Sequence, residues 1–270
     1  MPSDSIAFDR AAGFYDETRG FPPGEEQHVA ALFAQAGALT AHQRVLEIGV
    51  GTGRIALPLA AHVGRVIGLD LSRPMLNRLR AKRRAEPVHI LEGDATQLPF
   101  APDTCDAVVA VHVFHLMANW RGALDEIVRV LRPGGMLLHG YHQRIEQPGT
   151  LLDVMSRAWE AVIGAERTPV IGIPRELRAH FLDDAGWQQT GATQLHPYRH
   201  RMTPREYLNW MERRVWSSLW HVSDEAVQRG LAAVQEVIAA HGIPLDQPVE
   251  SASNFAVQAY LPPPDQGRDR

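Results

Sequence analysis

Three glycines stand at alternate positions in the stretch VLEIGVGTGRIALPLA, residues 45–60: Gly49, Gly51 and Gly53. Glycine lets the backbone approach a ligand that a side chain would exclude, and the N-terminus of a following helix adds a favourable dipole. Asp70 lies 17 residues after Gly53, where a carboxylate can accept the hydroxyls of a ribose. This spacing predicts a nucleotide-like ligand, but a tight turn could use the same glycines for packing alone.

The loop departs from the dinucleotide fingerprint G-x-G-x-x-G/A in one place, because Arg54 stands where the third glycine or alanine belongs. Its own spacing is G-x-G-x-G, and the acid Glu47 precedes it. Taken with Asp70 alone, these features still fit either a dinucleotide or another adenosine-containing ligand.

The elements that must position these residues follow from hydrophobic periodicity. Short apolar runs alternate with helix-period segments between residues 25 and 142, which is typical of a parallel sheet covered on both faces. Ser72 is an expected N-cap, because Pro74 follows it within the first turn. We predict strands at 44–48, 65–70, 88–92, 107–113 and 135–141, and helices near 54–61, 74–84 and 120–131.

Beyond residue 143 the pattern becomes mainly helical, with helices predicted at about 150–166, 174–185, 203–217 and 223–241. The tetrapeptide TPRE, which begins at Thr203, is a capping box with proline in the first turn. Two strand-like runs, 188–200 and 251–261, flank the last two helices. We expect them to form an antiparallel hairpin at the sheet edge. The predicted fold is therefore an α/β, doubly wound, Rossmann-like sheet of seven mostly parallel strands with a helical cap insertion.

Two further motifs make the ligand more specific. LEGDATQLPF places Asp94 just after the third strand, and RVLRPGGMLL places a Pro-Gly-Gly turn before the fifth. With these in order, residues 10–142 resemble the class I S-adenosylmethionine-dependent methyltransferases, particularly their ubiquinone/menaquinone-biosynthesis-like branch. The resemblance implies S-adenosyl-L-methionine as cofactor, and a sulfonium with an ammonium group suits carboxylates that a pyrophosphate would repel.

The resemblance also implies a role for each matching position. Glu47 would lie near the methionine amino group, with the three glycines against the methionine and ribose, and Asp70 would hold the ribose hydroxyls. In the N-terminal segment AAGFYDETRG, Tyr15 would cover the methionine moiety and Arg19 would pair with its carboxylate. The remaining implied cofactor contacts are Leu71, Met75, Asp94, Ala95 and Val111.

Methyl transfer is an in-line displacement in which the protein mainly aligns the nucleophile and excludes water. A general base helps when the acceptor must lose a proton. Near the strand ends the candidates for this role are His112, His115, Tyr141 and His142. Each could equally be a hydrogen-bonded pocket or surface residue.

The predicted cap is rich in aromatic residues, and its candidate substrate-binding residues are Trp159, Tyr207, Trp210 and Arg214. The alternative is that these side chains only pack the cap. The aromatic character favours a small apolar or aromatic acceptor. The tetrapeptide of amino-methylating DNA enzymes and the Pro-Cys pair of cytosine C5 enzymes are both missing, since VHVFHL occupies that place.

Composition and charge indicate which classes of partner and metal site to expect. The formal net charge is -4 and the basic residues are scattered, so we expect no nucleic-acid partner. Cys105 is the single cysteine, which excludes an internal disulfide and a cysteine-based metal cluster, and we predict no metal site. The absence of a signal-like or membrane-spanning stretch predicts a cytoplasmic protein acting on a small molecule.

We interpret residues 1–270 as one methyltransferase domain. Its predicted parts are lid helices in 1–40, a cofactor-binding core in 41–142, a helical cap in 143–187 and 201–248, edge strands in 188–200 and 249–261, and a disordered tail in 262–270. Two alternatives stay open: a non-catalytic S-adenosylmethionine-binding module, and an NAD-dependent Rossmann dehydrogenase in which Asp70 reads the ribose.

Overall fold

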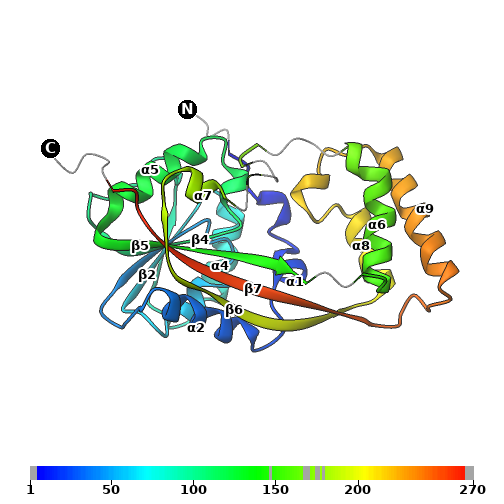
Figure 1. Ribbon diagram of the computed structural model, residues 1–270, viewed down its shortest axis with the longest axis horizontal. Helices are drawn as coiled ribbons and strands as arrows, with labels where there is room; N and C mark the ends of the chain where they lie inside the picture. The colour runs from blue at the N-terminus through cyan, green and yellow to red at the C-terminus, as the bar shows by residue number, and fades with distance from the viewer. Residues whose placement is uncertain (1–4, 146–147, 167–170, 174–176, 178–179, 265–270) are drawn as a thin grey trace. The chain divides into compact units, whose positions relative to one another are not determined.

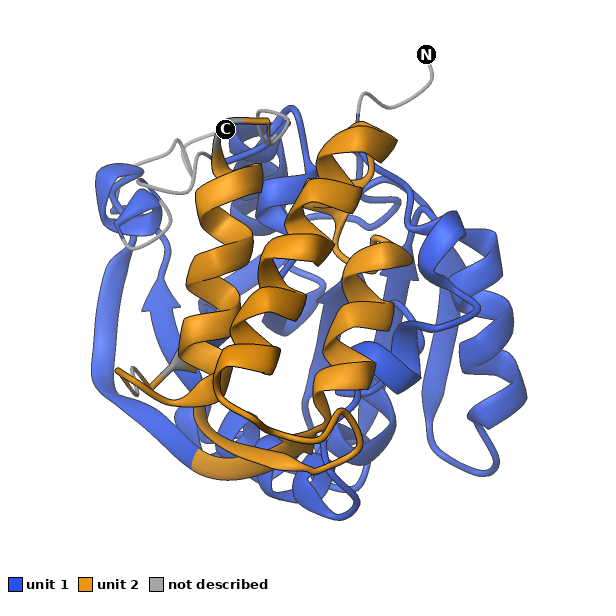
Figure 2. Cartoon of the chain, turned by 90° about the vertical axis from the view of Figure 1, so that its right-hand side faces the viewer, with its two compact units in different colours: residues 1–142, 170–196, 255–270 blue, residues 143–169, 197–254 orange. Residues whose placement is uncertain are grey.

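The structure, a computed structural model, describes residues 5–145, 148–166, 171–173, 177 and 180–264. It contains two compact units (Figure 2). The first comprises residues 1–142, 170–196 and 255–270, and the second comprises 143–169 and 197–254. The described residues between 171 and 187, predicted as part of the cap, thus belong to the first unit. The organisation as one domain with a cap insertion stays a prediction.

A seven-stranded sheet is the centre of the fold (Figure 1), with the strand order β3-β2-β1-β4-β5-β7-β6. The first five strands run parallel, and β7 and β6 form an antiparallel hairpin at the edge. The predicted fold class is confirmed. The strands are β1 (Arg44–Ile48), β2 (Arg65–Asp70), β3 (Val88–Glu92), β4 (Cys105–Val111), β5 (Leu131–Arg144), β6 (Gln188–Met202) and β7 (Val249–Leu261).

The strand order reverses at β1, which pairs with β2 on one side and β4 on the other. Connections from β1 and from β4 therefore leave in opposite directions, and in open α/β sheets ligands bind at such a reversal, outside the carboxyl ends of the strands. The glycine loop, Asp70 and the residues after Val111 all follow such carboxyl ends. Topology thus collects the predicted site residues at one edge of the sheet.

Helices cover both faces of this sheet. Leu137 packs in the same cluster as helix α5 (Trp120–Val130), while a Cβ on Gly37, just after helix α2 (Glu25–Ala36), would meet Leu138. Because neighbouring strand residues point to opposite faces, α2 and α5 lie on opposite sides of the sheet. The remaining helices of this unit are η1 (Asp9–Ala11), α1 (Tyr15–Arg19), α3 (Ala56–Leu59), α4 (Arg73–Lys82), η2 (Phe114–Leu116) and α7 (Phe181–Asp184).

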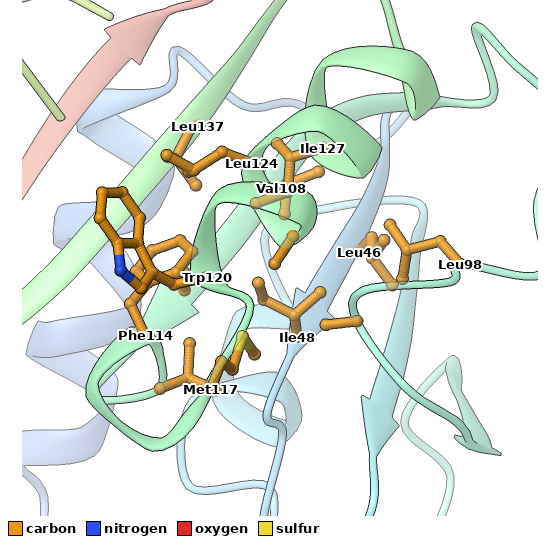
Figure 3. Close-up of a cluster of buried hydrophobic side chains, with 14 of the residues drawn as sticks. Leu46, Ile48, Leu98, Val108, Phe114, Met117, Trp120, Leu124, Ile127 and Leu137 are labelled. Atoms are coloured by element: carbon orange, nitrogen blue, oxygen red, sulfur yellow. The ribbon is translucent and has the colours of Figure 1, made fainter. Parts of the chain in front are cut away.

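The core on the α5 side is continuous and apolar (Figure 3). Strands β1 and β4 contribute small and branched side chains, and α5 lays its apolar face on them. Phe114 and Trp120 close the cluster toward the carboxyl ends of the strands. Its labelled members are Leu46, Ile48, Leu98, Val108, Phe114, Met117, Trp120, Leu124, Ile127 and Leu137.

The second unit holds three helices that lie side by side (Figure 2), namely α6 (Leu151–Ile163), α8 (Pro204–Glu212) and α9 (Asp224–Ala240), with the short turns η3 (Gly164–Glu166) and η5 (Ser217–Leu219). Each helix begins with a side-chain cap, from Thr150, Thr203 and Ser223 respectively. The predicted capping box between Thr203 and Glu206 is present, as is the Ser72 cap of α4.

Several predicted boundaries were wrong for local reasons. Strand β4 ends at Val111 rather than residue 113, because His112 takes a left-handed φ of 51°. Helix α8 ends at Glu212 rather than residue 217, since Arg214 has a φ of 49°. Strand β5 begins at Leu131, earlier than predicted, because the Pro-Gly-Gly segment lies within it at a register shift.

Two predicted segments fall partly outside the described residues. Of the predicted helix 174–185 the structure describes residue 177 and α7 with its flanks, and of the predicted tail 262–270 it describes residues 262–264. None of the described helices combines the length and the apolar character that crossing a bilayer demands.

Candidate functional site

The glycine loop joins β1 to α3 through three left-handed residues: Gly49, Gly51 and Gly53 have φ values of 67°, 55° and 79°. A Cβ on Gly49 would come within 2.5 Å of Val113, and one on Gly53 within 2.2 Å of Leu79. These two glycines are therefore required by packing. A Cβ on Gly51 would meet only Tyr15, at 4.0 Å, so Gly51 faces the open side of the loop. It is the glycine placed for a ligand to approach the backbone.

Glu47 is the most unusual group in the loop, because its side chain is only 2% exposed and its Oε2 has no hydrogen-bond partner. Burial raises the pKa of Glu47 to about 8; Arg54 opposes the rise and the carboxylate of Asp70 adds to it. An unpartnered buried carboxyl oxygen is costly to fold around. It fits a cationic ligand group, such as an ammonium, that would supply the missing partner.

Asp70, at the end of β2, accepts one hydrogen bond from the glycine loop and one from the start of α4. Its Oδ2 accepts from Gly51 N–H at 2.8 Å and its Oδ1 accepts from Ser72 N–H at 2.8 Å. Burial nevertheless raises its pKa. Ser72 in turn donates its hydroxyl to Asp9 at 2.6 Å. The carboxylate thus fixes the loop backbone and keeps lone pairs for the hydroxyls of a ribose.

Asp94 shows the geometry of a turn former. Its Oδ1 accepts from both the N–H and the hydroxyl of Thr96, at 2.8 Å each, and Ala95 between them is buried. This is the local bond that Asp side chains make in turns, and it leaves Oδ2 for another donor. The cofactor role of Asp94 stays a prediction.

The N-terminal segment is tied to the glycine loop by polar contacts. Thr52 donates its hydroxyl to Asp16 at 2.5 Å, and Lys82 Nζ lies 2.9 Å from both oxygens of Asp16. Arg54 donates to the carbonyl oxygen of Arg19 and lies 4.9 Å from the ring centroid of Phe21. These contacts hold the segment that contains Tyr15 next to the loop.

Arg19 itself is half-buried, and burial lowers its pKa to about 10, with Tyr15 and Arg54 as the nearby charges. A desolvated guanidinium gains most from a carboxylate partner. This environment fits the predicted pairing with an amino-acid carboxylate, which stays a prediction.

Leu71 and Met75 follow Asp70 on the way into α4. Leu71 is partly exposed, whereas Met75 is only 1% exposed and its N–H is bonded to the Ser72 hydroxyl. Met75 thus lies in the hydrophobic core, as is usual for an apolar residue on the inner face of an amphipathic helix. Contact of either residue with adenine stays a prediction.

His112 directly follows Val111, at the carboxyl end of β4. Its Nε2 is buried without a hydrogen-bond partner, and its ring stacks on His142 with centroids 4.9 Å apart and planes at 10°. Burial lowers the pKa of His112 well below 6.5, and His142 adds to the fall. The imidazole is therefore neutral at physiological pH. It can accept a hydrogen bond or a proton but is a weak base.

Tyr141 and His115 lie near this position, and the charge of His115 contributes to the lowered pKa of His112. The ring of Tyr141 is 5.4 Å from that of His139 on the same strand, and burial raises the tyrosine pKa. His115 lies in η2, two residues after Val113. Among the four predicted proton-transfer residues, His112 and His142 are in direct contact, since their rings stack on each other.

Sequence reasoning did not identify the aromatic side chains that pack near these histidines. Burial lowers the pKa of His139 to about 4, and its ring lies 6.0 Å from Phe114 and 5.6 Å from Phe181. Phe21 and Phe255 pack at 5.3 Å from each other and both contact His142. Period-two spacing of His139 and Tyr141 on one strand was the available signal.

The four predicted substrate-binding residues belong to the second unit. Trp159 and Tyr207 are 2% and 6% exposed and lie within its hydrophobic core, and Trp210 packs against this cluster. Arg214 pairs with Asp224. The structure places these side chains as packing and ion-pair residues of that unit, and any contact with an acceptor stays a prediction.

Comparison with known proteins gives one family match: residues 46–139 match the family described as methyltransferase domain. A demethylmenaquinone methyltransferase of Clavibacter sepedonicus is 36% identical over 139 residues, covering 50% of this chain and 56% of that protein. A fatty-acid O-methyltransferase of Mycolicibacterium smegmatis is 33% identical over 147 residues, covering 52% and 54%. The chain thus spans about half the length of these curated relatives.

Among solved structures, a proposed type II methyltransferase from Anaeromyxobacter dehalogenans superposes with a TM-score of 0.67 at 18% identity, covering 87% of this chain and 97% of that one. At this identity the likeness shows the fold alone. The family match covers β1 to β5, the part of the sheet that carries the glycine loop, Asp70, Asp94 and His112.

Proposed function

Since residues 46–139 carry a methyltransferase domain within a class I methyltransferase fold, we propose that the chain transfers a methyl group from S-adenosyl-L-methionine to a small apolar or aromatic metabolite. The observation that carries the proposal is Glu47. A buried carboxyl group with an unpartnered oxygen beside the glycine loop fits a ligand that carries an ammonium group.

The residues around Glu47 fit the rest of this cofactor. Asp70 takes the ribose hydroxyls, Gly51 lets the ribose and methionine approach the backbone, and Arg19 pairs with the methionine carboxylate. Tyr15 covers the methionine moiety, and Asp94 accepts the adenine amine with the oxygen that Thr96 leaves free. Dinucleotide binding is disfavoured because the acids Glu47 and Asp70 would face a pyrophosphate.

The bound cofactor supplies an electrophilic methyl group on its sulfonium. The chain's own task is to hold the acceptor in line and to exclude water. The rings of Phe114, Phe181 and His139 pack on one another in the core close to His112, so the surroundings of the proposed acceptor site are aromatic and suit a flat or aliphatic acceptor.

His112 is the favoured group for accepting a proton from that acceptor. Its neutral imidazole has a buried Nε2 without a partner, which a hydroxyl of the acceptor could satisfy. His142 stacks on the ring and fixes its plane. Its low pKa makes His112 a weak base, which restricts it to the more acidic hydroxyls, such as those of a phenol or hydroquinone, rather than an aliphatic alcohol.

The names of the relatives support an apolar acceptor without naming one compound. One relative is named for demethylmenaquinone and another for fatty acids, and both substrates are largely apolar. The aromatic wall and the histidine pair favour the quinol-like class over the carboxylic acid class, because a carboxylate needs no general base.

The test is a transfer assay with isotopically labelled S-adenosylmethionine and two acceptor pools, hydroquinones and long-chain fatty acids. We expect S-adenosylhomocysteine and labelled product from the hydroquinone pool. A matched variant is His112→Asn, because asparagine tolerates the left-handed backbone at this position and cannot act as a base. We expect it to lower kcat by about 100-fold or more while cofactor affinity stays unchanged.

If the chain bound the cofactor but transferred a methyl group to neither pool, the alternative of a non-catalytic S-adenosylmethionine-binding module would be favoured. Equal activity of His112→Asn and the wild type would remove the proton-acceptor role. Preference for fatty acids would overturn the acceptor class but leave the methyltransferase activity intact.

A further inference from the structure

A second cluster of chemically capable side chains lies apart from the glycine loop, on α2 and β6. Glu25, His28 and His196 each offer one ligand atom, and these atoms all lie within 4.8 Å of one another. Glu25 Oε2 contacts His196 Nε2 and is 3.4 Å from His28 Nδ1. The two imidazole rings stack with centroids 5.0 Å apart. One carboxylate oxygen therefore faces a nitrogen of each ring.

Local structure explains why the three groups converge. Glu25 and His28 are one turn apart in α2, so both project from one face of its first turn. Gly24 starts the helix with a left-handed φ of 92°, which turns the chain into this first turn. His196 comes from a strand 171 residues after Glu25 and completes the group. Its side chain is 20% exposed, against 66% for His28.

The donor set selects a class of ligand. Two neutral imidazoles and one carboxylate are the ligands that Zn²⁺ and neighbouring first-row divalent ions prefer, and a fourth position then holds water. Around tetrahedral Zn²⁺, ligand atoms are about 3.3 Å apart. The Glu25–His28 separation of 3.4 Å already matches this value, whereas Glu25 and His196 are in hydrogen-bond contact and would move apart to admit the ion. The exposed His28 side chain can turn to complete the set.

We infer that Glu25, His28 and His196 bind a divalent transition-metal ion of the zinc class. A Glu–His ion pair alone would need one imidazole, whereas here two imidazole nitrogens approach the same carboxylate oxygen. A cation between them satisfies all three lone pairs at once. Bound metal would link the first turn of α2 to strand β6.

The experiment uses the full chain without a polyhistidine tag, titrated with Zn²⁺ by calorimetry at a pH of about 7.5, where imidazole is neutral. Glu25→Gln, His28→Ala and His196→Ala each remove one ligand. His89→Ala is the matched control, because His89 is an exposed histidine on β3. Circular dichroism of the metal-free variants checks their folding, and His28→Ala is the safest of them because His28 is mostly exposed.

We expect one Zn²⁺ per chain in the wild type and in His89→Ala, and a loss of affinity of at least about tenfold in each ligand variant. The melting temperature of the wild type should rise with added Zn²⁺, and that of the ligand variants should not. Co²⁺ should give the visible absorption of a tetrahedral site in the wild type only. Absence of Zn²⁺ binding, or equal binding by wild type and all three variants, would overturn the inference.

Discussion

The carboxyl end of the sheet and the core of the helical unit treat buried polar atoms differently. Around the glycine loop, Glu47 Oε2 and His112 Nε2 are buried without partners, and His112 and Gly51 hold left-handed backbone. In the helical unit, all three long helices carry side-chain caps, and one continuous apolar cluster fills the space between them.

The difference matches the proposed roles of the two regions, ligand binding at the sheet edge and packing in the helical unit. In the helical unit, local rules of stability are broken at donor groups, namely the buried N–H of Trp159 and the buried Nε of Arg214, and at the left-handed backbone of Arg214, whose guanidinium is paired with Asp224. At the sheet edge they are broken by an ionisable carboxyl group, whose burial costs far more than that of a neutral N–H. A ligand that supplies the missing charge explains why such a group is retained.

The largest expected effect lies on the packing side. Trp159→Ala should lower the free energy of unfolding by about 3 to 5 kcal/mol, because the indole is almost wholly buried against α9, where Gly230 leaves room for it. Chemical denaturation followed by far-ultraviolet circular dichroism measures the change.

Trp159→Phe is the control, since it keeps most of the apolar volume. A destabilisation below about 1 kcal/mol in Trp159→Ala would show that the side chain is not a packing residue. A role in acceptor binding would then return as the better interpretation.

The next effect concerns Glu47 in the ligand-free protein. The folded-state pKa is about 8 and the ordinary value is 4.5, so between these values the unfolded chain ionises while the folded chain keeps the proton. Stability therefore falls as pH rises through this interval. Glu47→Gln cannot ionise, and above pH 8 it should be more stable than the wild type by roughly 2 to 4 kcal/mol.

Thermal unfolding from pH 5 to pH 9 measures this gain in stability. The matched control is Glu236→Gln, because Glu236 is an exposed acid on α9. Parallel pH dependence in the wild type and Glu47→Gln would mean that Glu47 is not the group responsible.

A smaller effect is expected for Asp70→Ala, and it concerns the affinity for the cofactor product rather than the stability of the protein. Asp70→Ala removes the acceptor for Gly51 and Ser72 as well as the proposed ribose contact. We expect S-adenosylhomocysteine affinity to fall by about 1.5 to 3 kcal/mol, measured by calorimetry. Asp125→Ala, an exposed acid on α5, is the control. Unchanged affinity in Asp70→Ala would contradict the ribose role.

The smallest effect is expected at the Asp16–Lys82 pair, whose side chains are 45% and 36% exposed. Lys82→Met should weaken cofactor binding by less than about 1 kcal/mol, and the difference should vanish at high salt. A loss that persists at high salt would show that Lys82 acts on the ligand itself.

Much of the sheet was predictable because its strands are short apolar runs. The bounds of β1, β2 and β3 were predicted to the residue, and Ser72 and Thr203 cap the helices they were expected to cap. Periodicity is a local signal, and these elements are defined locally.

What was missed depends on distant contacts. Asp16 and Lys82 are 66 residues apart, and Glu25 and His196 are 171 apart, so no spacing rule brings either pair together. The left-handed backbone of His112 and Arg214 ended a strand and a helix that periodicity would have continued. The predicted acceptor residues Trp159 and Tyr207 followed helical spacing, which is shared by core and binding residues alike.

The central claim is that Glu47 is buried to receive a cationic cofactor group. Its most direct test is a calorimetric titration with S-adenosylhomocysteine from about pH 6 to pH 8, comparing the wild type with Glu47→Gln. We predict that wild-type affinity rises toward pH 8, by up to about tenfold per unit as Glu47 ionises, and that Glu47→Gln binds weakly at every pH. Equal, pH-independent affinity in both proteins would contradict the account.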